Sequence, residues 1–295
     1  MFRTGKFRTE QMRAPMPLLA LLAGLVALFG FGINFGELVV DRAVPAWHDH
    51  GGHGSGSGED RSKGPGGLAV ADQGYVLRPR TTRFTAGELD NFRFNVFSDN
   101  GRPVTDFAQH GDRRMDLFVV RRDMSGYQHL YPIMDPDGTW TVPLQLAEPG
   151  SYRTIAEFVP RAGATPVALG VDLEAPGFVE LGPISKVSTV AEVDGYTVIW
   201  TGDLVAGSVS RIWMHVMRDN VPVTDLDPFL GGAGHVVIFR EGDLGYLHVR
   251  PVPGPRRDTS IAFDVDVPTA GYYRMFLEFQ HHGQVRTAEF TAETR

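Results

Sequence analysis

Histidines occur at equivalent places in two similar hairpins of the sequence, and imidazole is a common ligand of transition metals. The second hairpin is closed if Arg240 pairs with Gly245 across the turn. This register puts His235 and His248 diagonally on one face of the hairpin. Diagonal neighbours lie ~7–8 Å apart at Cα, so both rings can reach one metal ion at ~2.0–2.1 Å per bond. The same register sets Arg250 opposite His235, where its charge disfavours a cation.

The first hairpin has the same pairing register but fewer histidines. Asp116 takes the place of His235, and His129 takes the place of His248. A histidine and an aspartate can still bind a divalent cation. Two ligands per hairpin are an incomplete set, and the weaker candidates to complete it are Tyr131, Glu278, Gln280 and His282. The alternative is that each histidine is structural and hydrogen-bonds to a carbonyl or carboxylate.

The hairpins belong to an internal duplication, the feature to look for first in a sequence. Five blocks recur in the same order at shifts of 119–121 residues; the motif Pro-Val-Thr-Asp, for example, occurs at 103–106 and again at 222–225. Chance does not produce five ordered blocks. We therefore expect two domains, residues 68–175 and 183–295, joined by a linker at 176–182.

The duplicated region predicts an all-β fold. Apolar and polar residues alternate at 92–97 and again at 212–216, the pattern of a half-buried strand. Turn residues interrupt the apolar segments at the short, regular spacing that is typical of β-sandwiches. No stretch of this region keeps a helical stripe over three turns. We expect two tandem immunoglobulin-like antiparallel β-sandwiches.

The N-terminal part has a different composition. Residues 1–13 carry four basic side chains and one acidic one, and residues 14–36 are uncharged and rich in leucine and alanine. A membrane-spanning helix needs ~20 such residues, and its basic flank stays in the cytoplasm. The hydrophobic core of a signal peptide is shorter, ~7–15 residues. We therefore expect an uncleaved anchor, with the domains outside the cell membrane; cleavage would instead give a secreted protein.

Residues 37–67 are rich in glycine and serine and are expected to form a flexible tether. This segment holds His48, His50 and His53, which are weaker candidates for binding a metal. A flexible ligand set loses chain entropy when it closes around an ion. A solvated linker is therefore the alternative interpretation of the tether.

Composition excludes several classes of function. The 295 residues have a net charge of −7, the opposite of a basic nucleic-acid footprint. There is no cysteine, which excludes disulfides and thiolate ligands and leaves copper or zinc bound by imidazole. We find no G-x-S-x-G, H-E-x-x-H, phosphate-loop or dinucleotide-binding motif. The sequence therefore predicts a protein that is not an enzyme.

Segments on and around the two hairpins resemble a family of actinobacterial membrane-anchored or secreted proteins with a duplicated domain. The resemblance extends over nearly the whole chain and rests on residues 117–132, 137–140, 149–153, 234–235, 246–248 and 279–285. Similar single-copy domains occur in exported bacterial proteins associated with heavy metals, particularly copper, which implies a metal role. In this chain Asp116, Tyr131 and Arg250 replace three of the six hairpin histidines of the family. The resemblance then implies a weak first site and a reduced second one.

Two function classes remain open. The first is a membrane-anchored extracytoplasmic protein that binds copper or zinc through the hairpin histidines. The second is a non-catalytic cell-envelope module that binds a protein partner and no metal, an expectation by analogy of fold.

Overall fold

Strands make up the regular structure of this chain, as the short alternating segments predict. The computed structural model describes residues 64–109, 113–163, 165–180, 186–252 and 260–294. These residues form nineteen strands and no helix. Within the same ranges no helix is long and apolar enough to cross a membrane. The expected anchor and the tether histidines His48, His50 and His53 lie outside the described residues.

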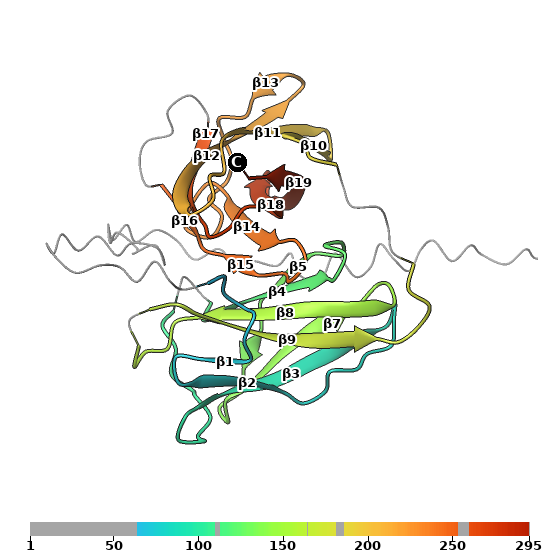
Figure 1. Ribbon diagram of the computed structural model, residues 1–295, viewed down its shortest axis with the longest axis vertical. Coiled ribbons are helices and arrows are strands. Elements are labelled where there is room, and N and C mark those ends of the chain that lie inside the picture. Colours follow the sequence, from blue (N-terminus) through green and yellow to red (C-terminus); the bar gives the residue numbers. More distant parts are fainter. Residues whose placement is uncertain (1–63, 110–112, 164, 181–185, 253–259, 295) are drawn as a thin grey trace, which may run out of the picture. The chain divides into compact units, whose positions relative to one another are not determined.

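The first domain consists of two antiparallel sheets (Figure 1). Its strands are β1 Ala71–Asp72, β2 Tyr75–Pro79, β3 Leu89–Ser98, β4 Met115–Arg121, β5 Gln128–Leu130, β6 Ile133–Met134, β7 Thr139–Gln145, β8 Gly150–Phe158 and β9 Val167–Ala175. One sheet has the order β1-β2-β3-β7-β6, and the other has the order β5-β4-β8-β9.

The second domain repeats this arrangement. Its strands are β10 Val190–Val193, β11 Tyr196–Gly202, β12 Ser208–Arg218, β13 Val221–Pro222, β14 His235–Arg240, β15 Tyr246–Leu247, β16 Val249–Pro251, β17 Ser260–Val267, β18 Tyr272–His281 and β19 Gln284–Glu293. The sheet orders are β10-β11-β12-β17-β16, with β13 on β12, and β15-β14-β18-β19. The same order in both domains agrees with the predicted duplication.

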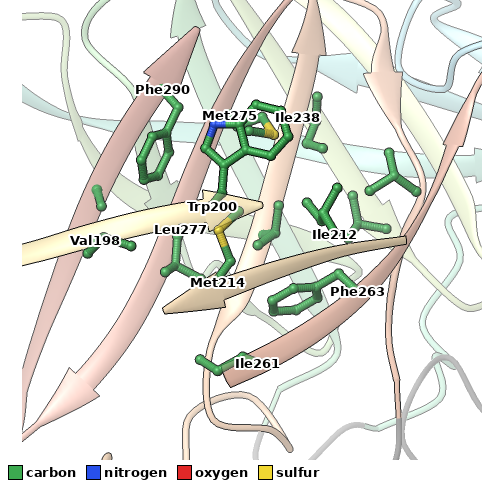
Figure 2. Close-up of a cluster of buried hydrophobic side chains, with 14 of the residues drawn as sticks. Val198, Trp200, Ile212, Met214, Ile238, Ile261, Phe263, Met275, Leu277 and Phe290 are labelled. Atoms are coloured by element: carbon green, nitrogen blue, oxygen red, sulfur yellow. The ribbon is translucent and has the colours of Figure 1, made fainter. Parts of the chain in front are cut away.

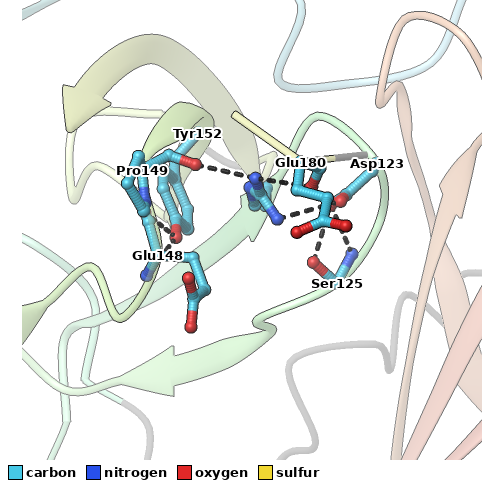
Figure 3. Close-up of polar contacts among 7 residues, drawn as sticks. Asp123, Ser125, Glu148, Pro149, Tyr152 and Glu180 are labelled. Atoms are coloured by element: carbon cyan, nitrogen blue, oxygen red, sulfur yellow. Dashed lines mark hydrogen bonds and ion pairs between the residues drawn. The ribbon is translucent and has the colours of Figure 1, made fainter. Parts of the chain in front are cut away.

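Both domains have the strand order and the corner of an immunoglobulin-like sandwich. In such folds a tyrosine near the start of one strand hydrogen-bonds back to the backbone a few residues upstream. The Tyr152 hydroxyl donates to the Glu148 carbonyl at 2.7 Å (Figure 3), and the Tyr273 hydroxyl donates to the Thr269 carbonyl at 2.7 Å. The predicted all-β, immunoglobulin-like class is confirmed.

Each sandwich encloses its own apolar core. In β12 every second residue is buried, so Ile212, Met214 and Val216 lie on one face, where Trp200 from β11 joins them (Figure 2). The first domain buries a cluster of aromatic rings around Trp140. Burial of aromatic side chains of this size contributes a large share of the stability of a domain.

Two of the sheets are buried on both faces. The inner strands β4, β8, β14 and β18 carry runs of four or more consecutive buried residues instead of alternating ones. A third apolar cluster accounts for this, because it joins sheet β5-β4-β8-β9 of the first domain to sheet β15-β14-β18-β19 of the second. Its buried members are Phe118, Val120, Met124, Ile155, Val237, Phe239, Leu244, Tyr246 and Phe276. The duplicated domains thus meet through equivalent sheets.

The segment before β1 contacts both domains. Gly66 pairs with Tyr246 of β15, through backbone hydrogen bonds of 2.8 and 2.9 Å. One residue later, the Gly67 amide donates to the Ala168 carbonyl of β9 at 3.1 Å. A Cβ at Gly170 would lie 1.8 Å from the Gly67 carbonyl oxygen, so this close approach requires glycine. The segment therefore connects the edge of the second domain to the first.

The second strand of the predicted hairpin is broken into β15 and β16, which corrects the predicted position of Arg250. Pairing with β14 follows the predicted register for Tyr246 and Leu247 only. The chain then changes sheet, and Arg250 pairs with Asp264 of β17 in the opposite layer. The residue opposite His235 on the neighbouring strand β18 is Glu278, not Arg250. A carboxylate therefore stands beside this imidazole.

Candidate metal centre between the two domains

The hairpin of the first domain positions His129 beside Asp116. His129 of β5 pairs with Phe118 of β4, which places Asp116 two residues away on the same face. His129 Nε2 lies 3.1 Å from Asp116 Oδ1. At the turn of this hairpin, the Arg121 guanidinium donates to Asp123 at 3.1 Å and to the Pro149 carbonyl at 2.7 Å (Figure 3). The diagonal arrangement that the sequence predicts is present in this hairpin.

Glu278 of the second domain joins the two histidines. Its Oε2 lies 2.7 Å from His129 Nδ1 and 3.3 Å from His235 Nδ1. One ligand atom from each of these three residues lies within 4.8 Å of the other two. The His129 side chain is 1% exposed, that of Glu278 6% and that of His235 18%. The cluster is therefore a nearly buried site shared by the two domains.

The charges of the cluster stabilise one another. Burial lowers the pKa of His129, but hydrogen bonds to Asp116 and Glu278 outweigh burial and raise it to about 9. Burial raises the pKa of Glu278, but hydrogen bonds from His129 and His235 outweigh burial and lower it to about 2. Burial raises the pKa of Asp116, but the hydrogen bond from His129 and the nearby positive charges of His129, His235 and Arg113 together lower it. Without a metal, His129 is therefore an imidazolium between two carboxylates.

The donor set and its spacing fit a borderline divalent ion. At ~2.1 Å per bond, two ligands of a tetrahedral ion lie about 3.4 Å apart. The separation of Glu278 from His235 already matches this value, and the separation from His129 has to open by about 0.7 Å. Asp116 would hold the other ring nitrogen of His129, and metal-binding histidines usually have such a partner. His129 and Glu278 also line a cavity of about 460 Å³, which gives an ion a route of approach.

The weaker candidates are divided between this cluster and other places. The Tyr131 hydroxyl lies 3.4 Å from His129 Nδ1, and its ring stacks under the Arg113 guanidinium at 3.6 Å. Gln280 lines the same cavity. His282 lies elsewhere, at the turn between β18 and β19.

The predicted pairing of His235 with His248 is not what the structure shows. His235 lies beside His129 of the first domain, and the centroids of the two rings are 5.3 Å apart. His248 lies after the end of β15, and its Nδ1 is 4.0 Å from Glu157 Oε1. No potential ligand cluster among the described residues contains both His235 and His248. The change of sheet after Leu247 separates the two rings.

Glu157 is a buried carboxylate opposite Asp116 on the neighbouring strand β8. It is the duplicated counterpart of Glu278, since Glu-Phe occurs at 157–158 and again at 278–279. Here the Tyr246 hydroxyl donates to Glu157 Oε2 at 3.0 Å. Burial, together with the nearby charge of Asp116, raises the pKa of Glu157 to about 7. Equivalent glutamates of the two domains thus have opposite pKa shifts.

The metal-free chain should lose stability as the pH rises from 5 to 9.5. Glu157, with a pKa raised from 4.5 to about 7, stabilises the fold fully below pH 4.5 and loses this effect through pH 7. His129, with a pKa raised from 6.5 to about 9, stabilises it fully below pH 6.5 and loses this effect through pH 9. Urea midpoints measured in the presence of EDTA should therefore fall across this range. A midpoint that is constant or rises with pH contradicts the two shifts.

Comparisons with known proteins agree with the duplication. The family model described as a domain of unknown function, DUF8832, matches residues 69–174 and 191–295. No curated protein matches the chain. Among solved structures, the chain is similar to FdeC, a broadly conserved Escherichia coli adhesin (12% identity, TM-score 0.25, covering 77% of this chain and 66% of that one). It is also similar to invasin, a bacterial integrin-binding protein (10% identity, TM-score 0.24, covering 77% of this chain and 41% of that one).

The match spans less than two thirds of the length of each of these two structures. The family model, in contrast, covers more than half of this chain in two consecutive matches, which confirms the predicted duplication. This chain is a member of the DUF8832 family and contains two copies of its domain.

Proposed function

We propose that the two domains bind one zinc or copper(II) ion between them through His129, His235 and Glu278. The observation that carries the proposal is the convergence of these three side chains, two of them histidines from different domains, on one buried point. Nitrogen and oxygen donors without sulfur suit both ions. Copper is also the metal implied by the resemblance in the sequence.

The proposed role is non-catalytic binding at the cell envelope. The expected anchor at residues 14–36 would hold the domains outside the membrane, where they would bind zinc or copper from the surroundings of the cell. In the metal-free chain the imidazolium of His129 occupies the centre of the cluster, so metal binding must release its proton. Binding should therefore weaken as the pH falls. The ion would take over from that proton in holding the two domains together.

One observation favours a second candidate, a metal-free envelope module that binds a protein partner. Both ring nitrogens of His129 already have carboxylate partners, so the cluster is satisfied as an ion pair. In this case the cluster fixes the two domains against each other and has no ligand of its own. The titration below distinguishes the two candidates.

Calorimetric titration of the full-length chain with ZnCl₂ and with CuCl₂ tests the metal site. We expect His235→Gln to abolish one bound equivalent, because a third of the ligand set is lost. Asp116→Asn should weaken the same equivalent by ~10–100-fold, the usual effect of removing the partner of a metal-binding histidine. Matched controls are His248→Gln, outside the cluster, and His215→Gln on β12, whose imidazole lies 3.2 Å from Thr201.

Each control should leave the affinity and the number of bound ions unchanged. If His235→Gln binds the same number of ions with the same affinity as the unmodified chain, the interface does not hold the metal and the second candidate replaces the first. Loss of binding in His248→Gln would instead restore the hairpin pairing predicted from sequence.

A further inference from the structure

A second group of potential metal ligands lies in the second domain, in addition to the interface cluster. Asp225, His281 and His282 each offer one ligand atom, and these atoms lie within 4.8 Å of one another. His281 Nε2 is 3.2 Å from Asp225 Oδ1, and the ring centroids of the two histidines are 3.8 Å apart. The first of these distances is close to the ~3.4 Å expected between two ligands of a tetrahedral ion.

The turn between β18 and β19 fixes these histidines. His281 pairs with Gln284, and the two residues between them, His282 and Gly283, have φ of 54° and 74°. Positive φ at both central residues is the geometry of a tight type I′ hairpin. The Asp227 carboxylate accepts a hydrogen bond from the Gly283 amide at 2.8 Å and holds the turn against the Asp225 segment. The positions of His281 and His282 are thus fixed by a short, regular turn.

The equivalent position of the first domain holds an ion pair between two side chains. Asp106 is the duplicated counterpart of Asp225, and Arg161 is that of His282. The backbone is the same in both copies: Ala108 donates to the Val159 carbonyl at 2.8 Å, and the counterpart bond in the second domain is 2.9 Å long. In the first domain the Arg161 guanidinium donates to Asp106 Oδ1 at 2.9 Å. A cation that is part of the chain therefore neutralises this aspartate in the first domain.

In the second domain two imidazoles stand where the first has a guanidinium and a proline. We propose that a borderline divalent transition-metal ion binds Asp225, His281 and His282 and supplies the positive charge that Arg161 supplies in the first domain. This site is independent of the interface cluster. Carboxylate and imidazole donors without sulfur suit Zn²⁺, Cu²⁺ or Ni²⁺.

The groups around His281 orient its ring for metal binding, but two nearby arginines weaken the binding of a cation. The Tyr196 hydroxyl lies 2.7 Å from His281 Nδ1 and can accept a hydrogen bond from that N–H, which leaves Nε2 unprotonated and free for the metal. Arg218 lies 3.4 Å from the same hydroxyl, and Arg286 stacks on the Tyr196 ring at 4.6 Å. These two cations oppose a metal charge, and the carboxylates of Asp225 and Asp227 offset them. We therefore expect weaker binding here than at the interface.

Zinc titration of the full-length chain at pH 7.5 by calorimetry tests the second site. Two equivalents should bind to the unmodified chain. Asp225→Asn and His282→Asn should each remove the weaker equivalent, or weaken it at least tenfold, and leave the tighter one. Both side chains are exposed, and asparagine accepts the positive φ at position 282, so the fold should be retained. Asp106→Asn is the matched control and should change neither equivalent.

The two sites fail separately in this experiment. If Asp225→Asn and His282→Asn bind zinc as the unmodified chain does, the second site is wrong, whatever His235→Gln shows. If they lose the weaker equivalent while His235→Gln loses nothing, the second site holds and the interface site is wrong. Binding of a single equivalent, abolished by His235→Gln alone, also overturns the second site. Absence of any zinc binding overturns both.

Discussion

Glu278→Gln should lower the free energy of unfolding at pH 7 by ~3 kcal/mol, the lower end of the effect of removing one partner of a buried ion pair. Glu278 is ionised and buried, and it is the partner of both His129 and His235. A neutral amide would leave the His129 imidazolium with only one of its two carboxylate partners, Asp116. Urea unfolding of the metal-free chain measures the loss.

The duplicated counterpart of Glu278 provides the matched control. Glu157 has a pKa raised to about 7, so at neutral pH much of it is already uncharged. Glutamine can also accept the hydrogen bond from Tyr246, and Glu157→Gln should cost about 1 kcal/mol or less. Glu192→Gln, on the exposed side of β10, should change the stability by under ~0.5 kcal/mol. Equal losses in Glu278→Gln and Glu157→Gln would show that the two glutamates do not differ as we infer.

Phe118→Ala should cost ~3–5 kcal/mol, the range for truncating a fully buried aromatic side chain. Phe118 is 0% exposed and lies at the centre of the cluster between the domains. Its ring is 5.3 Å from that of Tyr246 and 4.7 Å from that of His129, so its removal also loosens the metal centre. Because each sandwich has its own core, we expect the domains to separate before they unfold. We expect urea unfolding of the variant to show two transitions and that of the unmodified chain to show one.

The comparison for Phe118→Ala is Leu89→Ala. Leu89 is 67% exposed, and its truncation should change the stability by under ~0.5 kcal/mol. A Phe118→Ala variant that unfolds at the same urea concentration as the unmodified chain would mean that the sheet faces are not pressed together in solution. That result would also remove the basis of a shared metal site.

Local pattern was enough to predict most strands and one pair of site residues. Alternation defined β3 and β12, and period 2 placed Asp116 and His129 on one face, where they are hydrogen-bonded. The strands β2, β9 and β11, and the short strands β1, β6, β10 and β13, are not predicted, because their apolar segments do not stand out from the loops around them. Periodicity is a property of a single strand or hairpin. It therefore predicts which residues lie together within that hairpin, but no contacts beyond it.

The assembly of the site depends on contacts that no local pattern contains. Glu278 and His129 are 149 positions apart and belong to different domains, so only the packing of one sheet on the other brings them together. The runs of consecutive apolar residues in β4 and β14 are typical of strands covered on both faces, but they do not indicate which surface covers them. Continuous pairing past Leu247 would place His248 with His235, but the chain leaves the sheet at that point.

Gly66 precedes the first domain in the chain, yet its backbone partner is Tyr246, far along in the second. During synthesis Gly66 has no backbone partner until the second domain has emerged and docked, although Gly67 can already bond to Ala168 of the first domain. Pairings between residues so distant in sequence form late and slowly. The segment before β1 is therefore only partly paired while the first domain stands alone. Its last backbone contact forms when the second domain docks, which makes this docking the final step of folding.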